Sequence, residues 1–130
     1  MKKIYLILLV VCFVLAVSVN AFAQGYKEAH AWQSQTVDNT GWFTVNTSAS
    51  WTVEADVWID DESSSGYAAA SVYTEDNDHW MASVELSGEG EDSDYDAGTK
   101  QVTEPLDFKC VTNAGVSGSG IAEALATLTW

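Results

Sequence analysis

Strict alternation of apolar and polar side chains is the feature that most constrains this chain. In residues 51–59 the odd-numbered positions carry Trp, Val, Ala, Val and Ile, and the even-numbered positions carry Thr, Glu, Asp and Trp. Successive side chains of a β-strand point to opposite faces, so this period of two predicts a strand with one face buried and the other in water. Residues 79–87 repeat the pattern, and residues 102–112 carry it a third time.

Weaker alternation and turn chemistry extend the pattern along the chain. The weaker strand segments are residues 29–37, 42–49, 67–74 and 121–130. Turn-forming residues separate them at positions 38–41, 60–66, 75–78 and 113–120. We expect residues 75–78 to form a hairpin loop, and residues 87–99, rich in Gly, Ser and acidic side chains, to form one long loop. Pro105 cannot donate to a strand ladder, which predicts an edge or a bulge there.

These segments together predict an all-β fold. About seven or eight short strands, with no helical crossovers between them, favour antiparallel pairing over a parallel sheet. We therefore expect an antiparallel β-sandwich, of the immunoglobulin-like or the jelly-roll type. Residues 121–130 also fit a short helix, but their Thr and Trp content favours a strand.

The first 23 residues have the order of a secretory signal peptide. Met1-Lys2-Lys3 provides a basic start, an apolar run follows, and Ala21-Phe22-Ala23 is a small-x-small cleavage site. We expect cleavage before Gln24, which leaves residues 24–130 as one domain with no membrane span. The protein is then predicted to be exported to a periplasm, a cell surface or the extracellular medium.

The charge balance excludes one class of partner. Residues 24–130 hold three lysines against all 19 acidic residues, a formal net charge of −16. A nucleic-acid backbone would be repelled by this field, so nucleic-acid binding is not expected. Cys110 is the single cysteine of this part of the chain, so we expect it either to be buried or to pair between chains.

An acidic segment suggests a metal site. Asp92, Asp94 and Asp96 alternate along the chain, and Glu104 follows. Calcium takes six to eight oxygen ligands, which carboxylates on a flexible loop can supply. The first interpretation of the segment is a solvated acidic loop. A calcium site at these four residues is the alternative prediction.

The tryptophans suggest a binding surface. Trp58 lies on the polar face of its strand, Trp32 shares its face with a histidine, a serine and a threonine, and Trp42 shares its face with a threonine and an asparagine. Flat aromatic surfaces beside hydrogen-bonding groups suit sugar rings, and Trp also anchors protein interfaces. Core packing is the other interpretation of these three positions.

The sequence gives little support for a catalytic role. His30 and His79 are the two histidines, too few and too scattered for a triad or a zinc signature. We therefore expect a non-catalytic exported protein that has a structural or interaction role: a surface, matrix or filament subunit, or an adhesive module. Its partner would be a second copy or another surface protein. The alternative is a carbohydrate-binding module that uses the outward tryptophans, with or without calcium.

Overall fold

The computed structural model describes residues 25–33 and 37–130, and the predicted signal peptide lies outside them. The described residues form nine strands. These are β1 (Tyr26–Trp32), β2 (Val37–Asn39), β3 (Phe43–Val45), β4 (Ala49–Ile59), β5 (Ser65–Thr74), β6 (His79–Ser87), β7 (Gly90–Lys100), β8 (Leu106–Ser117) and β9 (Gly120–Thr129). Within these residues there is no helix long and apolar enough to cross a membrane.

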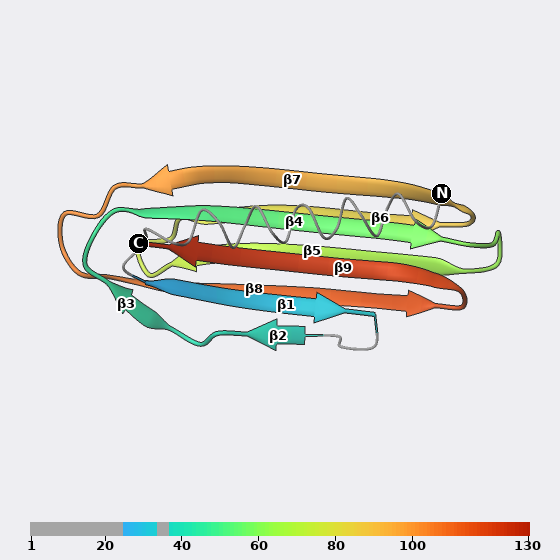
Figure 1. The fold of residues 1–130 in the computed structure, drawn as a ribbon, viewed down its shortest axis with the longest axis horizontal. Helices are drawn as coiled ribbons and strands as arrows, with labels where there is room; N and C mark the ends of the chain where they lie inside the picture. Colours follow the sequence, from blue (N-terminus) through green and yellow to red (C-terminus); the bar gives the residue numbers. More distant parts are fainter. Residues whose placement is uncertain (1–24, 34–36) are drawn as a thin grey trace.

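The strands form two antiparallel sheets that face each other (Figure 1). Sheet A has the order β1-β9-β4-β7, and sheet B has the order β2-β8-β5-β6, with β3 also paired to β8. Strands of the first half pair with counterparts in the second half: β1 with β9, β2 and β3 with β8, β4 with β7, and β5 with β6. This nested pairing is the jelly-roll form of the predicted sandwich.

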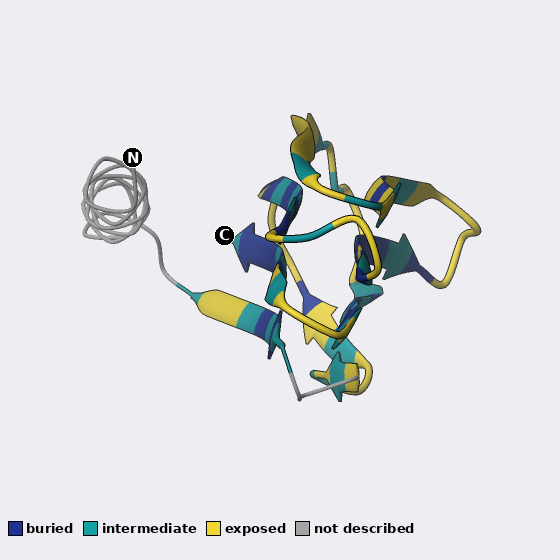
Figure 2. Cartoon of the chain, turned by 90° about the vertical axis from the view of Figure 1, so that its right-hand side faces the viewer, coloured by how far each residue is buried: buried dark blue, intermediate teal, exposed yellow. Residues whose placement is uncertain are grey.

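Small side chains fill much of the space between the sheets. Ala31, Ala124 and Ala55 lie in one row across β1, β9 and β4, and all three are fully buried. On the facing sheet, Ala68 and Ala70 of β5 are equally buried. In Figure 2 the buried stretches lie on the strands, and the connecting loops are mostly exposed. The two sheets therefore approach each other closely, as sheets lined with small residues can.

Larger groups complete the core at one end. The indole rings of Trp51 on β4 and Trp80 on β6 stack across the two sheets, with centroids 4.7 Å apart. Phe108 and Cys110 of β8 are fully buried in the same core. The alternation in residues 51–59 and 79–87 is thus confirmed, because its apolar positions face inward.

The structure corrects four sequence-based expectations. The predicted turn at 38–41 begins too early, because β2 occupies its first two positions. The predicted long loop at residues 87–99 is wrong, because β7 occupies most of it and pairs with β4 along its whole length. The predicted turn at 113–120 is too long, because β8 continues to Ser117. Pro105 does not lie in a strand, because β8 begins just after it at Leu106. The hairpin at residues 75–78 is confirmed: it joins β5 to β6, and Asn77 there takes a positive φ of 72°.

Candidate functional site

The outer face of sheet A brings together two of the three predicted tryptophans. The strand register sets Trp32 of β1 opposite Glu123 of β9, and Glu123 opposite Asp56 of β4. Trp58 follows Asp56 by two residues and therefore lies on the same face. From strand spacing and rise, the Cα atoms of Trp32 and Trp58 are about 12 Å apart. Carboxylates thus lie between two indoles on one surface. We call this surface the sheet A face: the outward side chains of β1, β9 and β4 around Trp32, Glu123, Asp56 and Trp58.

His30 is held next to this row. Its Nε2 lies 2.7 Å from Oε1 of Glu123. This hydrogen bond is the main reason that the pKa of His30 is raised above its usual value. The rings of His30 and Trp32 also meet edge to face, with centroids 6.3 Å apart. The contacts of His30 therefore link the positions of Glu123 and Trp32.

Two carboxyl groups of the sheet A face have raised pKa values. The pKa of Asp56 is raised to about 6, first because burial disfavours its charged form and then because Glu54 and Glu123 are nearby. The pKa of Glu54 is raised for the same reasons, with burial first and Glu123 second. Near pH 6 the carboxyl of Asp56 is therefore partly protonated, and it can donate as well as accept hydrogen bonds. The face therefore offers both kinds of polar partner to a ligand.

Trp42 lies elsewhere, on the outer side of sheet B. Its side chain is 52% exposed, and its ring lies 4.7 Å from Nζ of Lys109 on β8. Nζ of Lys109 also lies 5.2 Å from the ring of Tyr73, which stacks on His79 at 4.2 Å. The structure therefore separates Trp42 from Trp32 and Trp58, and the three do not form one site.

The predicted calcium ligands lie along a strand and its exit. Asp92, Asp94 and Asp96 follow one another at every second position of β7, so neighbouring Cα atoms are about 6.6 Å apart. Glu104 lies exposed in the segment after β7. Among residues 25–33 and 37–130, no group of three or more His, Cys, Asp or Glu is placed to hold a metal ion. Calcium binding by these four residues stays a prediction, which calorimetric titration with calcium tests.

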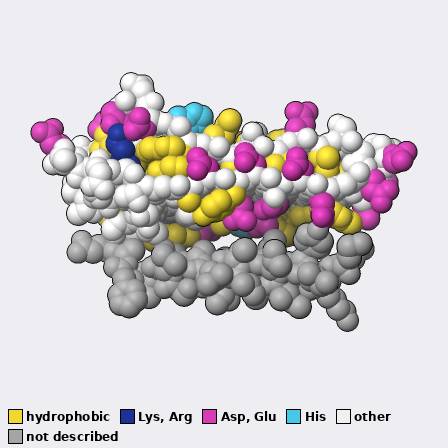
Figure 3. All heavy atoms as spheres, turned by 90° about the horizontal axis from the view of Figure 1, so that it is seen from above, with side chains coloured by type: hydrophobic (Ala, Val, Ile, Leu, Met, Phe, Trp, Pro, Cys, Tyr) yellow, Lys and Arg dark blue, Asp and Glu magenta, His cyan; other side chains and the backbone are white. Residues whose placement is uncertain are grey.

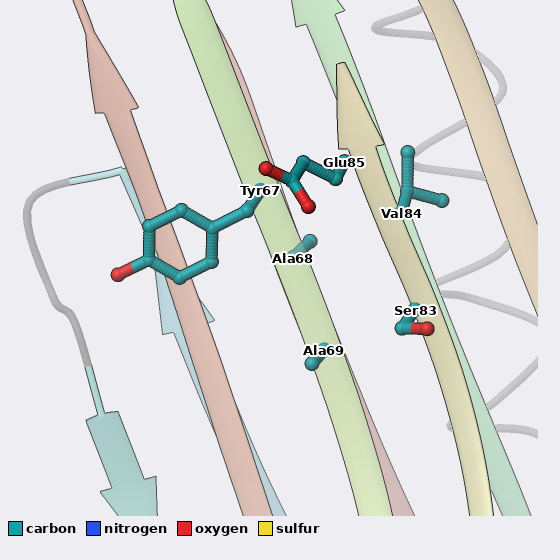
Figure 4. Close-up of a pocket in the computed structure, with 6 residues that line it drawn as sticks. All are labelled: Tyr67, Ala68, Ala69, Ser83, Val84 and Glu85. Carbon is teal, nitrogen blue, oxygen red and sulfur yellow. The ribbon is translucent and has the colours of Figure 1, made fainter.

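A shallow hollow marks the outer side of sheet B. It has a volume of about 330 Å³. Its lining residues are Tyr67, Ala68 and Ala69 of β5 with Ser83, Val84 and Glu85 of β6 (Figure 4). The ring of Tyr67 lies over Gly115 of β8, where an added Cβ would come within 2.9 Å of it. This hollow has a small-residue floor and one aromatic wall, and it lacks the paired indoles of the sheet A face.

Sequence reasoning missed most of the polar members of the sheet A face. Glu54 and Asp56 lie on the polar face of the alternating segment 51–59. The alternation therefore already indicated that they share a face with Trp58. His30 and Glu123 are 93 positions apart, and the pairing of β1 with β9 brings them together. Local periodicity contains no information about that pairing.

Comparison with known proteins gives weak structural matches at low identity. No family model and no curated protein matches this sequence. Among solved structures, the VP2 subviral particle of infectious bursal disease virus has 10% identity and a TM-score of 0.38, covering 82% of this chain and 33% of the viral chain. The globular domain of zebrafish complement 1qA protein has 8% identity and a TM-score of 0.39, covering 79% of this chain and 94% of its own.

A third structure contains a carbohydrate-binding module. The CBM22-1-GH10 modules of Clostridium thermocellum xylanase 10B, complexed with xylohexaose, have 9% identity and a TM-score of 0.35. That match covers 72% of this chain and 18% of the xylanase chain. This chain spans a third or less of the viral chains that it matches. At such scores the likenesses carry no argument about this chain, and its function must be argued from its own residues.

Proposed function

We propose that this protein is exported and acts as a non-catalytic binding module, with the sheet A face as its site for a neutral polysaccharide. The observation that carries the proposal is the placement of Trp32 and Trp58 on one face, with Glu123 and Asp56 between them. Indole rings can stack on the apolar faces of sugar rings, and carboxylates can bond the hydroxyl groups at the sides. The signal-like residues 1–23 support export.

The charge of the molecule is compatible with this ligand class. A neutral polysaccharide is not repelled by the net charge of −16 on residues 24–130, whereas an anionic polymer would be. The face also lies on four paired strands, which hold the two indoles at a set separation. A rigid scaffold of this kind reduces the entropy lost on binding.

The test is titration of the purified protein with a panel of soluble neutral polysaccharides, followed by variants. We expect Trp32→Ala and Trp58→Ala each to weaken binding about tenfold or more, because each removes one stacking surface. Trp42→Ala is the matched control, since it removes an exposed indole from the other sheet and should leave binding unchanged. Equal affinity of all three variants and the parent would overturn the assignment. Release of reducing sugar from the bound polysaccharide would contradict the non-catalytic role.

A specific observation also favours the structural or interaction role as a second candidate. The outer side of sheet B exposes Trp42 at 52% and Met81 at 51%, with Tyr67 also exposed. Exposed Trp, Tyr and Met are typical anchors of protein interfaces. If this surface binds a second copy, the protein should sediment above the monomer, and Trp42→Ala combined with Met81→Ser should return it to the monomer. A parent protein that stays monomeric at high concentration would eliminate self-assembly through this surface.

Assembly by addition of a strand to residues 67–74 receives no support from the topology. That segment lies in β5, which is paired on both sides, with β8 and with β6. Both sets of its backbone groups are therefore used.

A further inference from the structure

The free edge of β7 is closed by its own aspartates. As the terminal strand of sheet A, β7 pairs with β4 along one side and directs alternate amides away from the sheet. Three of these amides are already bonded. The backbone N–H groups of residues 93, 95 and 97 donate to Oδ1 of the preceding Asp92, Asp94 and Asp96, at 2.9, 3.0 and 2.9 Å. The amides at the centre of this edge are therefore satisfied within the strand.

One of the same carboxylates also reaches the edge of the other sheet. Strand β6 is the terminal strand of sheet B, next to the hollow already described. The N–H of Ser83 on β6 donates to Oδ2 of Asp94 at 3.0 Å. Asp94 thus bonds amides on both sheets, and it bridges two strands that do not pair with each other.

The three carboxylates point to the side of the strand that faces the other sheet. In the register of sheet A they lie opposite the buried residues Val57, Ala55 and Val53 of β4. The aspartates are exposed, because β7 lies at the open side of the sandwich. Figure 3 looks onto this side and shows acidic side chains recurring along its length, with a lysine at one end. Inward-pointing charges at a sheet edge are a known way to prevent another strand from pairing there.

We propose that Asp92, Asp94 and Asp96 form an edge guard that prevents a second copy of this chain from adding a strand along the β6–β7 side. Strand β7 has eleven residues and is exposed over most of them, so without the guard it would offer a long pairing edge. The three aspartates act in two ways. Their oxygens accept hydrogen bonds from the amides that a new strand would need, and their negative charges repel the same aspartates of an approaching copy. The predicted partner of the unguarded edge is a second copy, paired β7 to β7.

The association test compares three variants of the protein by sedimentation velocity. The triple variant Asp92→Ala, Asp94→Ala, Asp96→Ala removes both the acceptors and the charges, and we expect it to sediment as a dimer or larger species. The triple Asn variant keeps an acceptor oxygen at each position, so we expect it to associate less than the Ala variant. The charge-matched control replaces the exposed Glu62, Glu89 and Glu104 by Gln and should sediment as the parent protein does.

A second measurement does not depend on association. In the single variant Asp94→Ala we expect the amides of Tyr95 and Ser83 to exchange with solvent about tenfold faster, since each loses a charge-assisted hydrogen bond. The amides of Ser93 and Ala97 should be unchanged, because their own aspartates remain. A general loss of stability would instead accelerate all four together.

Two association results and one exchange result would overturn the guard. One is a folded triple Ala variant, by circular dichroism, that stays monomeric at the highest attainable concentration. The other is association of the charge-matched control to the same extent as the Ala variant. That result would show that the net charge, and not these three aspartates, keeps the copies apart. Unchanged exchange at both Tyr95 and Ser83 in the single variant would show that Asp94 does not protect these amides.

Discussion

The indole of Trp51 lies directly against the backbone of Gly98 on the neighbouring strand. A Cβ added to Gly98 would sit 2.7 Å from Cζ2 of Trp51. The indole also stacks on Trp80 of sheet B, which limits how far the ring can move away. Gly98 pairs with Trp51 in the register of β4 and β7, which makes this contact part of the alignment of the edge strand.

Replacement of Gly98 by Ala should therefore destabilise the fold. We expect a loss of about 1–3 kcal/mol, the usual range for overpacking a core contact. Urea unfolding monitored by tryptophan fluorescence measures the change. Thr99→Ala is the matched control: it is exposed on the opposite face of β7 and should stay within about 0.5 kcal/mol of the parent. A Gly98→Ala protein as stable as the control would contradict the close contact.

Ala124 provides a second test of close sheet packing. It is fully buried between Ala31 and Ala55, which lie opposite it on the two neighbouring strands. Leu at this position has no space between the sheets, so we expect Ala124→Leu to lower the free energy of unfolding by about 1–3 kcal/mol. Ala97→Leu adds the same atoms at an exposed position and should change stability by less than about 0.5 kcal/mol. Thermal melts of both variants make the comparison; equal melting temperatures would argue for looser packing.

Stability should fall as pH rises from 5 to 8. The pKa of Asp56 is about 6 in the folded state and about 3.8 otherwise, so folding favours its protonated form, and that contribution is lost as pH rises through about 6. The pKa of His30 is also raised, so its contribution is present below about 6.5 and is lost above its folded pKa. Both groups act in the same direction.

We expect Asp56 to account for about 0.5–1 kcal/mol of this change, after allowance for solvent screening at a half-exposed group. Urea unfolding at several pH values measures it. Asp56→Asn cannot titrate and should flatten the profile between pH 5 and pH 7. A parent profile as flat as that of the variant would show that Asp56 titrates normally.

The thiol of Cys110 should be unreactive in the folded protein. Its side chain is fully buried, and burial raises the pKa of the thiol to about 12. The thiolate is the reactive form, so we expect no labelling by a disulfide reagent at neutral pH until urea unfolds the chain. Rapid labelling of the native protein, or a disulfide-linked dimer on a non-reducing gel, would contradict this expectation.

The strands were predictable where one face of the sheet is buried and the other is in water. Residues 51–59 and 79–87 alternate strictly, and they form most of β4 and all of β6. β7 was missed because its apolar positions are absent: its side chains are exposed on both faces, apart from Gly98 and the strand ends. An edge strand at the open side of a sandwich has no core to face, so periodicity cannot reveal it.

The candidate site was predictable in part for the same reason. Trp58 was singled out because it breaks the pattern of a polar face, and the structure places it on the sheet A face with Trp32. Trp42 was predicted to join them because it shares a face with a threonine and an asparagine. The structure instead places it just before β3, beside Lys109 of sheet B.

The sequence by itself determined the all-β character of this protein, its antiparallel pairing and the inward face of its main strands, because a period of two is a local property that each segment carries. Tertiary structure alone decided which strands are neighbours, and with them the jelly-roll order, the meeting of His30 with Glu123, and the role of the aspartates on β7. Those features depend on long-range pairing, which is set by how all the segments bury their apolar faces together, and no single segment records it.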